Sequence, residues 1–202
     1  MIKNIVFDVG NVLVSFRWRE LMDDLGISKD YKKVFEKSIF GNPFWVELDR
    51  GVLDEKDVIA KIREENSAYN KEFDLLWENV DKLVEPYDYT VKMIDTLKER
   101  GFRVYLLSNY PVSLFELHTR CGRFPFLDKI VGKLVSAYVK LVKPDRKIYE
   151  YLLNQYDLKA QECVFLDDRL ENIEGARKVG MKGILFESYE QAWAELEEMI
   201  SE

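Results

Sequence analysis

Four short polar motifs, far apart in the chain, carry residue types that can handle a metal ion and a phosphate group. They supply four carboxylate or ammonium groups and a Ser-Asn pair, namely Asp8, Ser108, Asn109, Lys143, Asp167 and Asp168. Carboxylates suit Mg²⁺, which binds through one or two of them together with water and phosphate oxygens. A carboxylate that keeps a free oxygen can attack phosphorus and form an aspartyl-phosphate. A hydroxyl, backbone N–H groups and an ammonium can hold the phosphate oxygens.

Each motif is ambiguous when taken alone. Asp8 and Gly10 are residue types common in turns after a strand, and a Ser-Asn pair such as Ser108-Asn109 often caps a helix. A lysine before a proline, as at Lys143, is usually a solvated side chain. The interpretation becomes specific only if the chain folds so that the motifs meet.

Short apolar runs precede three of the motifs and predict buried parallel strands. The runs are residues 5–7, 104–107 and 163–166, and they are followed directly by Asp8, Ser108 and Asp167. In a parallel sheet the carboxyl ends of all strands lie at one edge, so residues distant in sequence converge there. We therefore expect the four motifs to form one site.

The remaining pattern alternates strands with helices. A fourth strand is predicted at 183–186 and a weaker fifth around 129–131 or just beyond it. Helices are predicted at 87–100, 146–156, 172–179 and 189–200, two of them followed by a glycine that suits a helix end. This alternation predicts an α/β fold, a doubly wound parallel sheet with right-handed crossovers.

Residues 16–86 break the alternation, because they contain several amphipathic helices and no convincing strand. We therefore expect a core domain of residues 1–15 and 87–202, with an all-helical cap domain at 16–86. An insert after the first strand lies at that strand's carboxyl end, where open α/β sheets bind ligands. Within the cap, Trp45 and Arg50 are the candidates for substrate contact.

The composition narrows the class of partner. A formal net charge of −7 over 202 residues argues against nucleic acid, which requires a concentrated basic face. No apolar run is long enough to span a membrane, and two cysteines without a secretory signal favour a cytoplasmic protein. The single histidine, His118, lies in a helical pattern and gives little support to a histidine-based site. Both a monomer and a homodimer formed through the insert are compatible with the sequence.

The order and context of the motifs resemble those of the haloacid dehalogenase superfamily, in its phosphatase branch with a helical cap. The motifs are Phe7-Asp8-Val9-Gly10-Asn11-Val12-Leu13, Leu107-Ser108-Asn109, Val142-Lys143-Pro144-Asp145 and a last segment that runs from Phe165 to Ala176. The pattern is most similar to bacterial α-D-glucose 1-phosphate phosphatases and to the phosphatase domain of soluble epoxide hydrolase. The resemblance implies a Mg²⁺-dependent hydrolase of a small phosphorylated metabolite.

The resemblance also implies a role for each acidic residue. Asp8 would be the covalent nucleophile and a Mg²⁺ ligand. The backbone carbonyl of Gly10 and the carboxylate of Asp168 would be further ligands. Asp167 would contact the metal or a water bound to it.

The phosphate group would be held by the other motifs. By the same resemblance, Ser108 and Asn109 would bind its oxygens, and Lys143 would bridge phosphate and Asp8. Asn172 would orient Lys143 or a neighbouring carboxylate.

Gly10 is a departure from most phosphatases of this superfamily, which carry an aspartate two residues after the nucleophile. That aspartate protonates the leaving group and activates water, and such acid–base help is typically worth about 10²- to 10⁴-fold in rate. The sugar-phosphate phosphatases share the Gly-Asn pattern, so activity is still expected. An anomeric oxygen is a better leaving group than an ordinary alcohol, which points to a hexose 1-phosphate as the substrate.

Three alternatives stay open at this point. A 2-haloacid dehalogenase of the same superfamily also lacks the second aspartate, but it needs no metal, and the adjacent acids Asp167 and Asp168 would repel each other without a cation. A protein that only binds phosphorylated ligands would explain Gly10 but has no need of a nucleophile such as Asp8. Transfer of phosphate between sugar positions is the weakest of the three, because it depends on the missing acid.

Overall fold

A five-stranded parallel sheet forms the centre of the computed structural model, which describes residues 1–201. Its strand order is β5-β4-β1-β6-β7, so β1 lies in the middle. The strands are β1 (Asn4–Phe7), β4 (Arg103–Ser108), β5 (Gly132–Val135), β6 (Cys163–Asp167) and β7 (Lys182–Leu185). The predicted α/β fold is confirmed, and the weak fifth strand lies just beyond 129–131.

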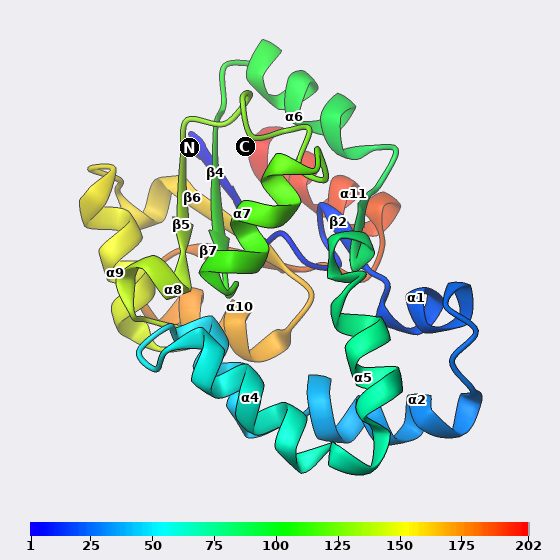
Figure 1. Cartoon of the computed structure of the whole chain (residues 1–202). Helices are drawn as coiled ribbons and strands as arrows, with labels where there is room; N and C mark the ends of the chain where they lie inside the picture. Colours follow the sequence, from blue (N-terminus) through cyan, green and yellow to red (C-terminus); the bar gives the residue numbers. More distant parts are fainter. Residues whose placement is uncertain (202) are drawn as a thin grey trace.

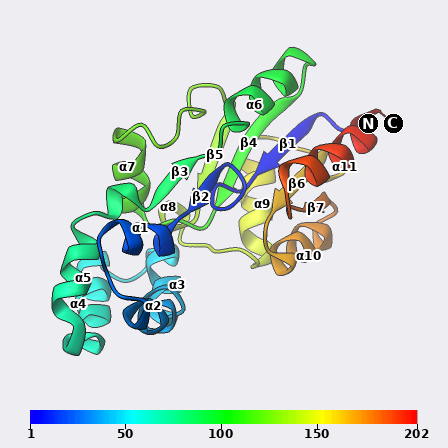
Figure 2. The ribbon, with the colours of Figure 1, turned by 90° about the vertical axis from the view of Figure 1, so that its right-hand side faces the viewer.

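Successive residues of β1 point to opposite faces of the sheet, and each face is covered by helices. Ile5 and Phe7 belong to one apolar core, and Val6 belongs to another. The first core is completed by α6 (Thr90–Glu99), α7 (Val112–Arg120) and α11 (Tyr189–Ser201), and the second by α9 (Arg146–Gln155) and α10 (Leu170–Lys178). Figure 2 shows α6 and α11 on one side of the sheet and α9 and α10 on the other. The sheet is therefore the middle of three layers, and the helices on both faces fix the strand ends at which the motifs lie.

The segment between β1 and α6 folds into a group of helices with an apolar core of its own, drawn from residues 18–83. Figure 1 shows these helices gathered beyond one end of the sheet. They are α1 (Trp18–Asp24), α2 (Lys29–Phe35), the π-helix η1 (Glu36–Phe40), α3 (Pro43–Arg50), α4 (Glu55–Glu65) and α5 (Asn70–Trp77), with short 3₁₀ turns at Ser67–Tyr69 and Val80–Lys82. Asp54 caps the start of α4, since its carboxylate accepts from the Lys56 N–H at 2.8 Å.

The expectation that this segment contains no strand is wrong at its two borders. β2 (Val14–Phe16) pairs antiparallel with β3 (Val84–Pro86), and the ribbon joins the sheet to the helical segment. Each strand has only three residues, too few to show a period of two in the sequence. The chain enters the helical segment through β2 and leaves it through β3, so their pairing holds both connections together.

Three smaller elements complete the fold: α8 (Ser136–Val139) follows β5, η4 (Ala160–Glu162) precedes β6, and a bridge links Gly10 to Val14. No helix within residues 1–201 is both long and apolar enough to cross a membrane.

Candidate active site

Asp8 stands at the carboxyl end of the central strand. Its backbone N–H donates to the Leu166 carbonyl at 2.9 Å, which continues the pairing of β1 with β6 by one residue. Its side chain accepts from the Val9 N–H at 2.7 Å through Oδ1. The carboxylate is thus fixed at the edge where the other strands also end.

The Lys143 ammonium bridges two of the predicted acids. Its Nζ lies 2.9 Å from Asp8 Oδ1 and 2.6 Å from Asp167 Oδ2, and only 1% of the lysine side chain is exposed. The Asn109 side chain binds the lysine backbone twice, donating to its carbonyl at 3.0 Å and accepting from its N–H at 2.8 Å. Because the Asn109 amide is used in this way, its backbone N–H is the group left for a phosphate oxygen.

Asp167 is fully buried, and both of its oxygens are already bonded. Besides Lys143, it accepts from the Asn172 amide at 2.9 and 3.0 Å and from the Arg169 N–H at 2.8 Å. Asn172 therefore orients the carboxylate beside the lysine rather than the lysine itself. These contacts make Asp167 a positioning group for Lys143, and its predicted contact with the metal stays a prediction.

Three carboxylates can each place one oxygen within 4.8 Å of the others, those of Asp8, Asp167 and Asp168. Asp168 Oδ2 accepts from the Asn11 amide at 2.9 Å, and Asn11 itself has a left-handed backbone with φ of 54°. Three carboxylates face a single ammonium, so the cluster is short of positive charge. Hard oxygen donors with excess negative charge fit a divalent cation such as Mg²⁺.

The pKa values of the carboxyl groups agree with this shortage of positive charge. Burial raises the pKa of Asp8 to about 7, opposed by Lys143 and reinforced by Asp167. Burial also raises the pKa of Asp168, and the hydrogen bond from Asn11 opposes it. Both effects would be reversed by a cation between the carboxylates, which favours their ionised forms.

Most of these groups form the floor of a pocket of about 180 Å³ between the sheet edge and the helical segment, whereas the fully buried Asp167 does not line it. The floor is polar, and Asp8, Gly10, Ser108, Lys143 and Asp168 all lie on it. The rest of the lining, called the wall here, is mainly apolar and has Asp49 as its one acid among the described residues. Its apolar members are Phe16, Trp45, Leu83, Val84, Tyr110, Pro111 and Leu114. The sequence motifs predicted the floor but not this wall.

Comparison with known proteins assigns the chain to a family. Residues 2–180 match the haloacid dehalogenase-like hydrolases. The chain belongs to this family. The resemblance stated from the four motifs, which include Asp8, Lys143 and Asp168, is therefore confirmed.

Relatives of this hydrolase chain include several phosphatases. It is 28% identical to the sesquiterpene phosphatase astK of Aspergillus oryzae over 90% of its length and 88% of that protein. It is 24% identical to the glyceraldehyde 3-phosphate phosphatase of Methanocaldococcus jannaschii, over 90% of this chain and 83% of the other. The fold matches that of the enzyme bt-2542 of Bacteroides thetaiotaomicron, solved with magnesium and inorganic phosphate, with a TM-score of 0.71 and 21% identity over 94% and 98% of the two chains.

The two predicted lid residues have different positions in this hydrolase. Trp45 lines the pocket and packs at 5.3 Å from the Phe40 ring centroid. Arg50 lies outside the pocket and pairs with Glu47 at 3.4 Å and with Asp145 at 3.8 Å. It links α3 to the loop before α9, so direct contact with a substrate has no support from its position.

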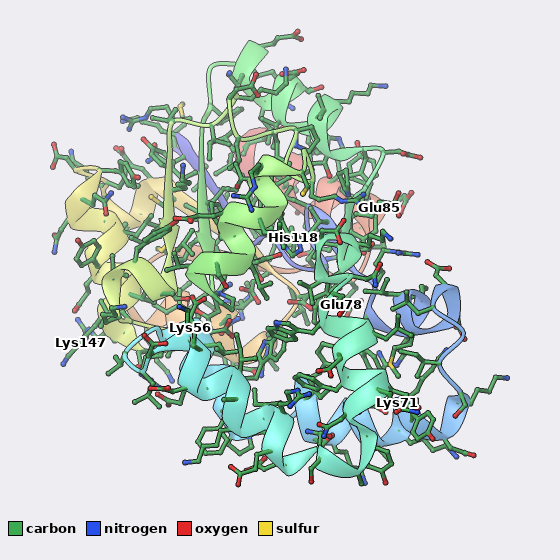
Figure 3. The ribbon with its side chains drawn as sticks, viewed as in Figure 1. Lys56, Lys71, Glu78, Glu85, His118 and Lys147 are labelled. Carbon is green, nitrogen blue, oxygen red and sulfur yellow. The ribbon has the colours of Figure 1, made fainter. Side chains whose placement is uncertain are left out.

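Sequence reasoning missed two polar residues of the site, Asn11 and Asp49. Asn11 belongs to the first motif and could have been singled out, because Asn tolerates the left-handed backbone observed there. Asp49 carried no signal, since an acid near the end of an amphipathic helix is usually exposed. His118 is structural: it is fully buried in α7 and bonded on both ring nitrogens (Figure 3).

Proposed function

We propose that the protein is a Mg²⁺-dependent phosphomonoester hydrolase that forms an aspartyl-phosphate on Asp8. The observation that carries this proposal is the position of Asp8 on the pocket floor, 2.9 Å from Lys143 and within reach of Asp168. The names of the two phosphatase relatives and the magnesium and phosphate bound by the enzyme bt-2542 support the same reaction class.

The residues of the floor divide the work. Asp8 attacks phosphorus with the oxygen that Lys143 does not hold, while the ammonium and the Ser108 hydroxyl bind phosphate oxygens. Asp8, the Gly10 carbonyl and Asp168 would hold Mg²⁺, which when bound offsets the charge of the phosphate group. Asp167 keeps the Lys143 ammonium in place through its own bonds to Asn172.

For the substrate, the pocket wall gives a specific preference. The predicted hexose 1-phosphate carries several hydroxyls, yet the wall offers few polar groups to them, and the Tyr110 hydroxyl is already bonded to His118 at 2.6 Å. An ester with an apolar organic group fits better against Phe16, Trp45 and Leu114. The sesquiterpene phosphatase relative supports this second class.

Phosphate release from p-nitrophenyl phosphate tests the reaction class. We expect turnover with Mg²⁺, and its loss on chelation and in the variant Asp8→Asn. Release of chloride from chloroacetate without metal would instead identify a dehalogenase. Phosphate binding without release by the wild type would identify a non-catalytic protein. Either outcome would overturn the proposal.

A substrate panel tests the preference of the wall. Prenyl and aryl phosphates should give higher kcat/KM than hexose 1-phosphates, hexose 6-phosphates or nucleotides. If α-D-glucose 1-phosphate is the best substrate, the original prediction is correct and the apolar preference is wrong. The cytoplasmic location and the monomeric or homodimeric state stay predictions from sequence.

A further inference from the structure

Within residues 1–201, the floor of the pocket offers no carboxyl or imidazole that is free to act as a general acid. Gly10 has none, and a Cβ built there would meet nothing within 4 Å, so the space beside Asp8 is open. Asp167 is fully bonded, and the Lys143 ammonium is shared between two carboxylates. Asp168 accepts from Asn11 and belongs to the group that fits a cation. The proton needed by a leaving alcohol must therefore come from elsewhere in the pocket.

Asp49 is the one carboxylic acid on the pocket wall within residues 1–201. It lies in the last turn of α3, and neither a hydrogen bond nor an ion pair from the described residues reaches its carboxyl oxygens. A carboxyl in a largely apolar wall without a partner is costly to keep, so a role in the reaction would account for it.

The position of Asp49 is fixed by the core rather than left to a mobile cap. Its backbone carbonyl accepts from the Ser136 hydroxyl at 2.5 Å, and the same hydroxyl accepts from the Tyr110 N–H at 2.9 Å. Two residues later, Gly51 ends α3 in a left-handed conformation so close to Ala137 that a Cβ would lie 2.8 Å from the alanine Cβ. The end of α3 is therefore held against α8.

We propose that Asp49 is the general acid and base of this hydrolase, in the role of the side chain that Gly10 lacks. The inference rests on the proposed function. In the first step Asp8 forms a bond to phosphorus, the bond from phosphorus to the leaving oxygen breaks, and that oxygen takes the proton of Asp49. In the second step water attacks phosphorus and gives its proton to the Asp49 carboxylate, and the bond to Asp8 breaks. Alcohol and inorganic phosphate leave, and both aspartates return to their starting states.

The acidity of Asp49 agrees with this role. Burial raises its pKa to about 7, the positive charges of Lys143 and Arg169 oppose the shift, and Asp8 adds to it. General acids and bases work best when their pKa lies near the operating pH, because both forms are then available. An aspartate with an ordinary pKa would be almost entirely ionised at neutral pH and could not donate.

The variant Asp49→Asn separates proton transfer from attack on phosphorus. In single-turnover measurements, cleavage of an alkyl phosphate such as hexyl phosphate should slow about 10²- to 10⁴-fold. Cleavage of p-nitrophenyl phosphate should stay within about threefold, because nitrophenolate leaves without a proton. Steady-state assays of the same variant should then show a burst of one nitrophenol per enzyme, since hydrolysis of the aspartyl-phosphate lacks its base.

A second variant tests the same role by rescue. Because the space at Gly10 is open, the double variant Gly10→Asp, Asp49→Asn should recover alkyl phosphate cleavage. Glu47→Gln is the matched control, another acid of α3 that lies outside the pocket, and its activity should equal that of the wild type. Thermal melting of all variants reports whether they fold.

The outcomes distinguish this inference from the proposed function. Equal effects of Asp49→Asn on both substrates, or no effect on either, would overturn the role of Asp49 and leave Asp8 chemistry intact. Absence of any Mg²⁺-dependent phosphate release by the wild type would overturn the proposed function itself.

Discussion

Two carboxylates of the active-site region, Asp167 and Asp49, differ in whether their oxygens are bonded, and the difference distinguishes a positioning role from a chemical one. Asp167, the fully buried partner of the floor residue Lys143, accepts from Lys143, Asn172 and a backbone N–H. The Asp49 carboxyl, on the wall, receives no hydrogen bond from the described residues, although the backbone carbonyl of Asp49 accepts from the Ser136 hydroxyl. A saturated carboxylate fixes its neighbours, whereas an unsaturated one is free to exchange a proton.

The floor and the wall also differ in how many of their residues could be substituted without loss of the fold. The floor is a closed network in which Lys143 neutralises two acids, so each member depends on the others. The wall combines Trp45, Asp49 and Leu83 from the helical segment, which has its own core, with apolar side chains that follow β4, such as Tyr110 and Leu114. We therefore expect the floor residues to carry out the reaction shared by the family and the wall residues to select the leaving group.

The largest expected effect comes from opening the floor network with Lys143→Met. The change leaves Asp8 and Asp167 without their cation, and breaking a buried pair in this way costs about 3–5 kcal/mol. Phosphatase activity should disappear, and the free energy of unfolding in urea should fall by that amount. Because the wall does not depend on this network, Trp45→Phe should leave the unfolding free energy nearly unchanged. Equal losses in the two variants would contradict the division between floor and wall.

Neutralising each of the two carboxylates gives the next contrast. Asp167→Asn removes the shorter partner of Lys143, and we expect a loss of about 1–3 kcal/mol in unfolding free energy together with slower cleavage of every substrate. Asp49→Asn removes an acid whose pKa is raised by folding, a shift that weakens the folded state as pH rises from about 4 towards 7. Its melting temperature at pH 7 should therefore equal or exceed that of the wild type.

That asymmetry matches what the sequence could and could not predict. The floor was predictable because apolar runs locate strands, and parallel strands must end together, which places Asp8 beside Asp167. Lys143 follows no strand, and its place beside Asp8 was predicted from the resemblance alone. The contacts of Asn109 and Asn172 were not, since an amide can bond to backbone, carboxylate or ligand equally well. Only the folded chain shows that one amide holds the Lys143 backbone and the other holds Asp167.

The wall was much less predictable, because its residues come from short elements placed by tertiary contacts. Val84 reaches the pocket from a three-residue strand whose partner lies about seventy positions earlier, and Leu83 directly precedes that strand. Trp45, singled out from the sequence, lines the pocket, and its contact with a substrate stays a prediction. Arg50, chosen by the same reasoning, pairs instead with Glu47 and Asp145. Helical periodicity says which residues share a face and does not say which surface that face meets.

A smaller effect is expected from the wall residue Trp45. Its ring lines the pocket and packs against Phe16 and Phe40, so Trp45→Ala removes contact area from an apolar substrate. KM for a prenyl phosphate should rise about tenfold, which is about 1.4 kcal/mol. The kcat for p-nitrophenyl phosphate should change little. A larger effect on glucose 1-phosphate than on the prenyl ester would show that the wall binds a sugar face instead.

The smallest predicted effect concerns His118, which is hydrogen-bonded to the wall residue Tyr110. Its Nε2 lies 2.7 Å from the Val80 carbonyl, which can only accept, so this nitrogen carries the proton. Nδ1 must then accept from the Tyr110 hydroxyl at 2.6 Å. The neutral ring satisfies both partners, and protonation would destroy the second bond.

The consequence is a pH dependence of stability with a defined sign. Burial lowers the pKa of His118 below its ordinary value of 6.5; Arg123 lowers it further, while the Val80 carbonyl and Asp81 oppose the shift. Below pH 6.5 the unfolded chain binds a proton that the folded chain does not, so stability is lost as pH falls, at most about 1.4 kcal/mol per pH unit. Urea unfolding at pH 7.5, 6.5 and 5.5 should show this slope in the wild type and a shallower one in His118→Gln, because titration of the pocket acids is common to both. Parallel slopes would mean that the ring can be protonated in place, and Tyr110 would then owe its position to the Ser136 bond alone.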